Sequence, residues 1–246
     1  MSLGKCCISG FIHDGTPAGE IKEVGGVRTY ISLPKGDYDK TKAILFFTDI
    51  FGVDTMPNGL LLADSFAANG YATYVVDYLK GDPVPMEAYQ SGNFDLMKWL
   101  ETHSPKDVAG PLVTKVQDAL KADGVKRFGC ASFCYGGRIA ADKVLDGTID
   151  VAVTAHPSLL DVPSDIEALN KKSTPFLINC ANEDVMLTKD KAEESEKILK
   201  DNKAFKFIYY DGGHGFAIRG DPSDPKQRKS ADDCFENSIN FLKEHL

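Results

Sequence analysis

The feature that most constrains the fold is a regular alternation between short apolar runs and longer amphipathic segments. The runs rich in Val, Ile, Phe and Tyr have the length and composition of strands, at 27–33, 43–48, 71–77, 126–132, 149–155, 175–181 and 205–210. The segments between them repeat apolar residues at helical spacing, at 57–69, 92–103, 109–123, 135–146, 187–201 and 227–245. Several strand runs are apolar on successive residues, as in strands covered on both faces. The pattern predicts an α/β fold with a mostly parallel central sheet flanked by helices on both faces.

Two segments depart from this alternation. Residues 1–25 are rich in Gly, Cys and Asp and show no clear period, so we expect an irregular lead-in on the surface. The segment 83–90 is expected to be a loop able to cover a site. The chain has 246 residues, 43% of them hydrophobic, and no internal repeat or low-complexity tract. A single domain over residues 1–246 is the economical prediction.

Charge and cysteine usage narrow the function classes. The formal net charge of −8 disfavours nucleic acid and membrane surfaces as partners. The six cysteines lie in a chain with no recognisable signal peptide and no apolar run of membrane-spanning length, so we expect reduced thiols and a cytoplasmic location. Cys6, Cys7 and His13 are close in sequence, but no second ligand pair has zinc-site spacing, and no metal is predicted.

Cys134 is the strongest candidate for a reactive group. It lies where a predicted strand ends and a helix begins at once, a turn that needs small residues two positions before and after its apex. Ser132 and Gly136 meet that need, which gives the nucleophile-elbow pattern with cysteine in the serine position. The helix N-terminus that follows would stabilise a thiolate. The alternative is that Cys134 is an inert buried cysteine. A disulfide between Cys130 and Cys134 would have to cross the corner between strand and helix, where the geometry for such a bond is doubtful.

A base and an acid follow in the order expected for an α/β-hydrolase. His214 lies between two glycines after a predicted strand, a context that lets its imidazole swing towards another strand end. Asp184 follows the strand 175–181 and would orient that imidazole, although Glu183 is an alternative that spacing does not exclude. His156 also follows a strand, either lining the pocket or serving as a structural histidine before a proline turn.

Taken together, these residues make the chain resemble the dienelactone hydrolase family. Its motifs occur in the same order as in that family, over nearly the whole chain. The similar segments are Phe133-Cys134-Tyr135-Gly136-Gly137, Asp184, His214-Gly215-Phe216, Asp49-Ile50-Phe51-Gly52 and, as in fungal members, Cys6-Cys7 with His13-Asp14-Gly15-Thr16-Pro17. The resemblance implies an α/β-hydrolase fold and a cofactor-free esterase or lactonase that works through an acyl-thioester. Carried over, Ile50 and Tyr135 would supply the oxyanion-hole N–H groups.

Three positions bear on how far the resemblance extends to chemistry. The best-known members have glutamate at the position of Asp49, where it takes the thiol proton, and aspartate is shorter by about one carbon–carbon bond, ~1.5 Å. Asp49 is therefore either a thiol-activating or pocket carboxylate or a capping residue. Arg219 and Lys80 lie near the positions of two arginines that hold a substrate carboxylate, but lysine does not reproduce a bidentate clamp. Arg219 is equally consistent with an ion-pairing role.

Two hypotheses follow. The first is a hydrolase of a small ester or lactone, with an anionic substrate as one option, in which Cys134 is the nucleophile, His214 the base and Asp184 the orienting acid. The second is a non-hydrolytic binding or thiol-redox protein that keeps the fold. Either would act as a monomer or homodimer.

Overall fold

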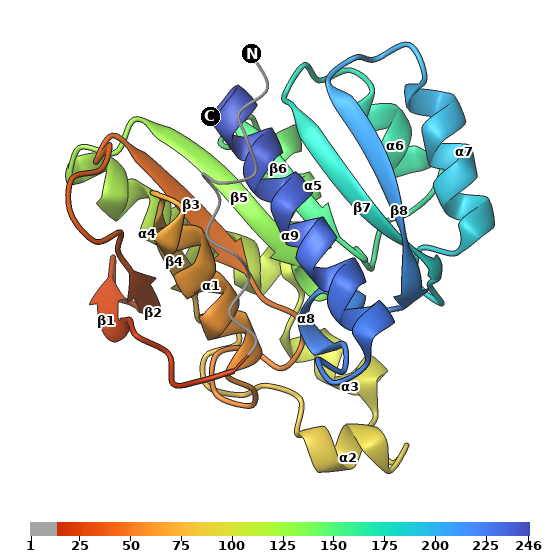
Figure 1. Ribbon diagram of the computed structural model, residues 1–246, viewed down its shortest axis with the longest axis horizontal. Coiled ribbons are helices and arrows are strands. Elements are labelled where there is room, and N and C mark those ends of the chain that lie inside the picture. The colour runs from red at the N-terminus through yellow and green to blue at the C-terminus, as the bar shows by residue number, and fades with distance from the viewer. Residues whose placement is uncertain (1–13) are drawn as a thin grey trace.

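The computed structural model describes residues 14–246 and is built on an eight-stranded sheet in the order β1-β2-β4-β3-β5-β6-β7-β8 (Figure 1). β2 pairs antiparallel with β1 and with β4, and the strands from β4 to β8 pair in parallel. The strands are β1 (Glu20–Val24), β2 (Val27–Ser32), β3 (Lys42–Phe47), β4 (Ala72–Val76), β5 (Arg127–Phe133), β6 (Val151–Ala155), β7 (Phe176–Glu183) and β8 (Phe205–Gly213).

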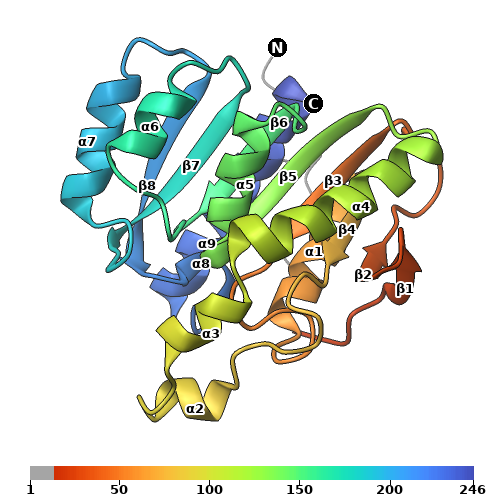
Figure 2. The ribbon, with the colours of Figure 1, turned by 180° about the vertical axis from the view of Figure 1, so that it is seen from behind.

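Helices cover both faces of the sheet. α1 and α9 lie on the face seen in Figure 1, and α4, α5, α6 and α7 lie on the other, seen in Figure 2. The helices are α1 (Asn58–Ala68), α2 (Met86–Gln90), α3 (Leu96–Thr102), α4 (Gly110–Ala122), α5 (Tyr135–Leu145), α6 (Ser164–Leu169), α7 (Lys189–Leu199), α8 (Phe216–Arg219) and α9 (Pro225–His245), with one π-helical turn, η2 (Pro105–Ala109). Each face of the sheet has its own buried apolar cluster. The predicted α/β-hydrolase architecture is therefore confirmed.

Each of the predicted strand segments forms a strand of this sheet, and the differences fall on short elements. β1 lies inside the expected irregular lead-in, so that prediction is wrong for residues 20–24. Its side chains are mostly exposed and polar, which leaves no apolar period to detect. The expected loop 83–90 contains the five-residue helix α2, which has no buried residue. Cys6, Cys7 and His13 lie outside the described residues.

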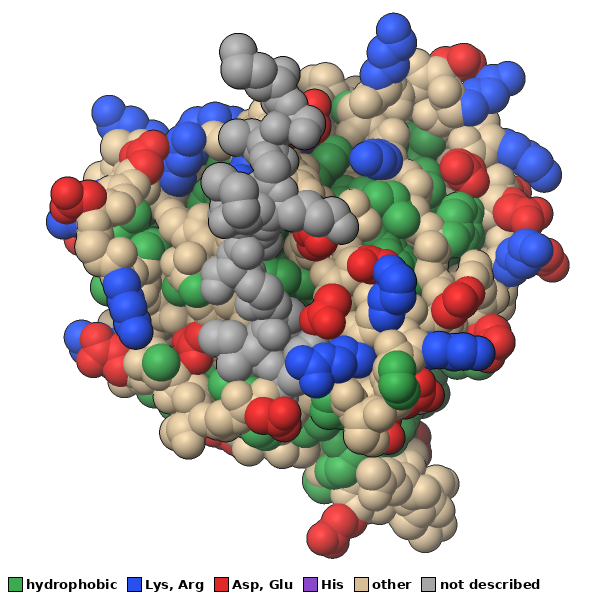
Figure 3. All heavy atoms as spheres, viewed as in Figure 1, with side chains coloured by type: hydrophobic (Ala, Val, Ile, Leu, Met, Phe, Trp, Pro, Cys, Tyr) green, Lys and Arg blue, Asp and Glu red, His purple; other side chains and the backbone are tan. Residues whose placement is uncertain are grey.

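The surface shows no membrane-spanning element in the part of the chain that the structure describes, because none of its helices is both long and apolar enough to cross a bilayer. On the face shown in Figure 3, acidic and basic side chains are interspersed over the helices and loops. Among the described residues visible on that face, charges of the two signs are therefore mixed.

The strand order changes direction at the centre of the sheet. From β3 the chain passes to β4 on one side, and it later returns to β5 on the other side of β3. In parallel sheets such a switch point leaves a crevice at the carboxyl ends of the two strands. The segments that follow β3 and β5 meet there, at the edge of the sheet near α2, α3 and α8 (Figures 1 and 2).

The turn from β5 into α5 passes very close to the end of β3. The Gly136 N–H donates to the carbonyl of Thr48 at 3.1 Å. A Cβ on Gly136 would lie 2.4 Å from the Phe47 carbonyl oxygen, and one on Gly137 would lie 2.5 Å from the Pro157 Cβ. Both glycines are therefore required by space, as the sequence pattern predicted for Gly136.

Replacing Gly136 by alanine is expected to lower the free energy of unfolding by about 1–3 kcal/mol, because the backbone of β3 or α5 must move to admit the new Cβ. Gly59→Ala in α1 is the matched control, since its added Cβ would meet nothing closer than 3.6 Å. Alanine there should leave stability unchanged or raise it by up to about 1 kcal/mol. Urea denaturation followed by circular dichroism compares the two. Equal stabilities would contradict the close approach.

Candidate active site

Cys134 lies at the apex of the turn between β5 and α5 with its backbone in a strained conformation. Its φ is +52° and its ψ is −115°, a region that residues with a Cβ rarely adopt. The strain is held by the surrounding backbone: the Cys134 N–H donates to Ala155, and its carbonyl accepts from Gly137 and Ser158. The turn thereby fixes the direction of the thiol, which is buried and faces the crevice.

His214 and Asp184 complete a chain of hydrogen bonds with this thiol. His214 Nε2 lies 3.0 Å from Cys134 Sγ, and His214 Nδ1 lies 2.9 and 3.0 Å from the two carboxylate oxygens of Asp184. Asp184 also accepts from the backbone N–H groups of Met186 at 2.7 Å and Leu187 at 3.2 Å. The carboxylate is therefore anchored before it meets the imidazole, and three residues far apart in sequence form one linear array.

The structure separates the two candidate acids. Asp184 is buried and contacts His214, whereas Glu183, the last residue of β7, is exposed and lines the neighbouring pocket. Side chains of adjacent residues in an extended segment point in opposite directions, so only one of the pair faces the imidazole.

The environment of His214 favours its protonated form. Burial lowers the pKa of the imidazole, but the hydrogen bonds to Asp184 and to the Cys134 sulfur outweigh burial and raise the pKa to about 9. An imidazolium at neutral pH, 3.0 Å from the sulfur, is the arrangement that stabilises a thiolate.

A pocket of about 360 Å³ opens beside the thiol. Its size lies within the range of small-molecule sites. Besides Cys134 and His214, its wall contains Ile50, Tyr89, Leu96, Leu100, Tyr135, Ser158, Leu159, Glu183, Val185, Met186, Gly213 and Arg219. Ile50 follows β3 and Tyr135 begins α5, and both residues, to which the family resemblance gives the oxyanion-hole N–H groups, border this pocket. No group of three or more His, Cys, Asp and Glu suited to a metal ion occurs within residues 14–246.

Residues 27–246 match the sequence model of the dienelactone hydrolase family. The chain belongs to that family. It is 32% identical to the hydrolase pyvD of Aspergillus violaceofuscus over 98% of this chain and 96% of that protein. It is 30% identical to dienlactone hydrolase 1 of Gibberella moniliformis over 96% of this chain and 92% of that protein.

Solved structures agree at the level of the fold. A putative dienelactone hydrolase from Klebsiella pneumoniae superimposes with a TM-score of 0.70 at 17% identity, over 89% of this chain and 93% of that chain. Family membership makes the protein a hydrolase, as the sequence predicted.

Asp49 and the partly buried Arg219 form an ion pair at the wall of this pocket. The Arg219 guanidinium donates to Asp49, and Asp49 also accepts from the Phe51 N–H at 2.9 Å. The guanidinium lies 5.4 Å from the centre of the Phe51 ring and packs against Gly215, where a Cβ would approach it to 2.5 Å. Asp49 is thus committed to Arg219, whereas the thiol contacts His214 and Ser158.

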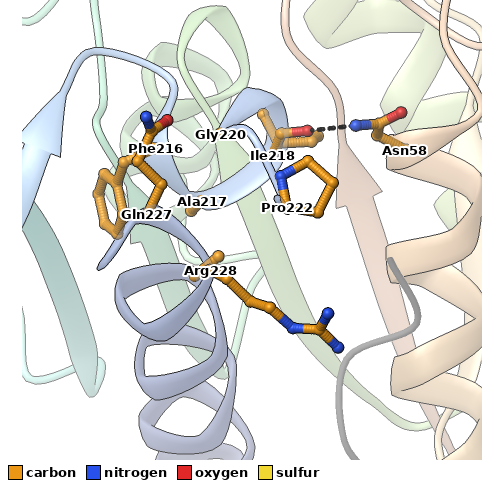
Figure 4. Close-up of a pocket in the computed structure, with 9 residues that line it drawn as sticks. Asn58, Phe216, Ala217, Ile218, Gly220, Pro222, Gln227 and Arg228 are labelled. Atoms are coloured by element: carbon orange, nitrogen blue, oxygen red, sulfur yellow. Dashed lines mark hydrogen bonds between the residues drawn. The ribbon is translucent and has the colours of Figure 1, made fainter. Parts of the chain in front are cut away.

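The segment that carries Arg219 is fixed from outside the pocket. The Asn58 side-chain amide, at the start of α1, donates to the carbonyl of Ile218 at 3.0 Å (Figure 4). Figure 4 also shows Pro222 and Gln227 around the small hollow behind this segment, whose volume of about 10 Å³ suits one water molecule. α8 is consequently held between α1 and α9 and presents Arg219 to the pocket wall.

Lys80 does not lie in this pocket, so the prediction that it binds substrate there is wrong. It is exposed, with φ of +59°, and lines a separate surface hollow with Arg28, Asp54 and Asp77. The two preceding residues, Tyr78 and Leu79, point into the core, and the turn that buries them directs Lys80 to solvent.

His156 lies behind the pocket and is not part of its wall. It is fully buried between three rings, with centroid distances of 5.1 Å to His214, 5.6 Å to Phe216 and 6.0 Å to Phe133. Neither ring nitrogen has a hydrogen-bond partner among the described residues. Burial, together with the positive charges of Arg219 and His214, keeps its pKa well below the ordinary value of 6.5. His156 is therefore a neutral packing residue behind His214.

Sequence reasoning missed Ser158. Its hydroxyl is buried 3.6 Å from Cys134 Sγ and lines the pocket. Its position after β6, at the same edge of the sheet as Cys134, was the available signal.

Replacing His156 by asparagine, which tolerates the positive φ of 40° at this position, should flatten the dependence of stability on pH. Because the folded protein keeps His156 neutral, the unfolded state binds the extra proton below pH 6.5, and stability falls as the pH falls. The slope from this group reaches about 1.4 kcal/mol per pH unit. His214 adds nothing there, since its pKa is raised and its contribution is complete below pH 6.5. Parallel curves of unfolding free energy between pH 6.5 and 5 for wild type and variant would refute this assignment.

Proposed function

We propose that the protein is a cysteine-dependent hydrolase of a small ester or lactone. The observation that carries the proposal is the hydrogen-bonded array from Asp184 through His214 to Cys134, with 3.0 Å between Nε2 and Sγ. The thiolate attacks the substrate carbonyl carbon and forms a tetrahedral intermediate. Its collapse expels the alcohol, which takes a proton from His214, and leaves an acyl-thioester on Cys134.

Water then completes the cycle. His214, now neutral, takes a proton from a water molecule that attacks the thioester carbonyl, and the second intermediate releases the acid and restores the thiolate–imidazolium pair. Asp184 holds the imidazole with Nε2 towards the sulfur and stabilises its charge.

The oxyanion of both intermediates is assigned to the backbone N–H groups of Ile50 and Tyr135. Ile50 lies in the turn after β3 and Tyr135 is the first residue of α5, so neither N–H has an acceptor within its own helix or strand. Both residues border the pocket beside Cys134. The pairing of one N–H after the nucleophile with one from an early loop is the arrangement this fold uses for acyl transfer.

In this proposal His214 acts as the base that deprotonates Cys134. The ion pair with Arg219 and the hydrogen bond from Phe51 engage Asp49, so a direct transfer from the thiol to Asp49 would first require that pair to break. In this proposal, Asp49 therefore has a structural role: it holds Arg219 through the ion pair and holds the turn at Ile50 through the hydrogen bond from Phe51.

Cys134→Ala should lower kcat/KM for p-nitrophenyl acetate by at least about 10³-fold, because it removes the attacking atom. Asp184→Asn should lower it by about 10²–10⁴-fold, because the imidazole loses both its orientation and its compensating charge. Asp201→Asn at an exposed turn after α7 is the matched control and should behave as wild type. Wild-type rates in Cys134→Ala would rule out the mechanism.

The hypothesis of a non-hydrolytic thiol protein predicts a reactive Cys134 without ester hydrolysis. Burial raises the pKa of the Cys130, Cys180 and Cys234 thiols, which leaves Cys134 as the reactive candidate among the described cysteines. At pH 7 iodoacetamide should modify wild type with a fast phase that Cys134→Ala lacks. Rapid alkylation of Cys134 without turnover of any ester in a broad panel would favour a thiol-redox or binding role over hydrolysis.

A further inference from the structure

The mouth of the Cys134 pocket is strongly apolar. Among the described large hydrophobic side chains that are exposed, four line this one pocket: Tyr89, Leu159, Val185 and Met186. Val185 has the highest exposed fraction of the four, 77%. Leu96 and Leu100 extend the apolar wall along α3. Exposed apolar side chains gathered around one concave site indicate an apolar ligand.

The charges around the pocket do not favour an anion. Arg219 is the cation in the described wall besides His214, and the buried carboxylate of Asp49 neutralises it. The Cys134–His214 pair has no net charge whether the proton is on sulfur or on nitrogen. With the Asp184 carboxylate included, the array of Cys134, His214 and Asp184 carries one net negative charge, and Glu183 in the pocket wall adds another. A carboxylate entering this pocket would therefore lose its hydration and meet net negative charge.

Lys80, the other cationic residue considered for binding a substrate carboxylate, does not line this pocket. Lys80 faces a separate hollow with Asp54 and Asp77. A carboxylate-bearing substrate would thus have no unpaired cation to bind among the described residues that line the pocket.

We propose that this pocket selects neutral, largely apolar esters or lactones and discriminates against substrates that carry a carboxylate. Glu183 is a specificity-determining residue in this scheme, because it lines the pocket, is exposed, and takes no part in the hydrogen bonds that join Asp184, His214 and Cys134. The inference rests on the proposed hydrolytic function and adds the substrate class.

A pair of esters matched in shape tests the selectivity. The p-nitrophenyl monoester of adipic acid and p-nitrophenyl 6-methylheptanoate share the leaving group and chain length, and the terminal carboxylate of the first replaces the isopropyl group of the second. Wild type should show a kcat/KM at least about tenfold higher for the neutral ester, after correction for spontaneous hydrolysis. The ratio should fall at 0.5 M NaCl, since salt screens the partly exposed charges.

Two variants test whether the charges of Glu183 and Asp49 cause the difference in kcat/KM between the two esters. Glu183→Gln keeps the shape of the side chain and should narrow the ratio by about threefold, through a higher kcat/KM for the monoadipate. Asp49→Asn leaves the Arg219 charge uncompensated and should narrow it further, whatever its effect on the absolute rate. Glu194→Gln, an exposed carboxylate on α7 outside the pocket, is the matched control and should leave the ratio unchanged.

The outcomes separate the two proposals. Equal or higher kcat/KM for the monoadipate in wild type would overturn the inferred selectivity while leaving hydrolysis intact. A tenfold ratio that Glu183→Gln does not change would overturn the role given to Glu183. Failure of wild type on both esters, with p-nitrophenyl acetate still hydrolysed, would overturn the inferred substrate class alone, and failure on all three esters would overturn the hydrolytic function as well.

Discussion

The arrangement of this site depends on the contact between the β5–α5 turn and the end of β3. Gly136 packs directly on the carbonyl of Phe47, and its N–H bonds to Thr48. No larger residue fits there, so the first turn of α5 lies against the loop that follows β3. The same contact brings Cys134 near the backbone of Ile50, because only Tyr135 separates Cys134 from Gly136 and only Asp49 separates Ile50 from Thr48.

The other residues of the site follow the ends of neighbouring parallel strands. β7 delivers Asp184 and β8 delivers His214 to the same edge of the sheet, and the imidazole bridges the carboxylate and the thiol. Behind the imidazole, the space is filled by the neutral ring of His156 and the apolar ring of Phe216. This packing limits the positions open to His214 without offering it a competing hydrogen bond.

The pocket wall has a different character from the reacting groups. Its charged members are either paired, as Arg219 is with Asp49, or negative, as Glu183 is, and its rim is apolar. The rim comes from the short helices α2 and α3 and from the segment after β7. In the proposed function, residues at the strand ends would therefore carry out the reaction, and the connections between the strands would select the substrate.

The sequence by itself determined the α/β fold, the elbow at Cys134 and the order of acid and histidine, because helix and strand periods and small-residue spacing are local properties. It also placed Cys134, Asp184 and His214 at strand ends, which parallel strands bring to one edge. Only the tertiary structure decided between Glu183 and Asp184, paired Asp49 with Arg219, and turned Lys80 away from the pocket. Those outcomes depend on the direction in which each side chain leaves its turn and on what it meets across the sheet, and neither is encoded in the spacing along the chain.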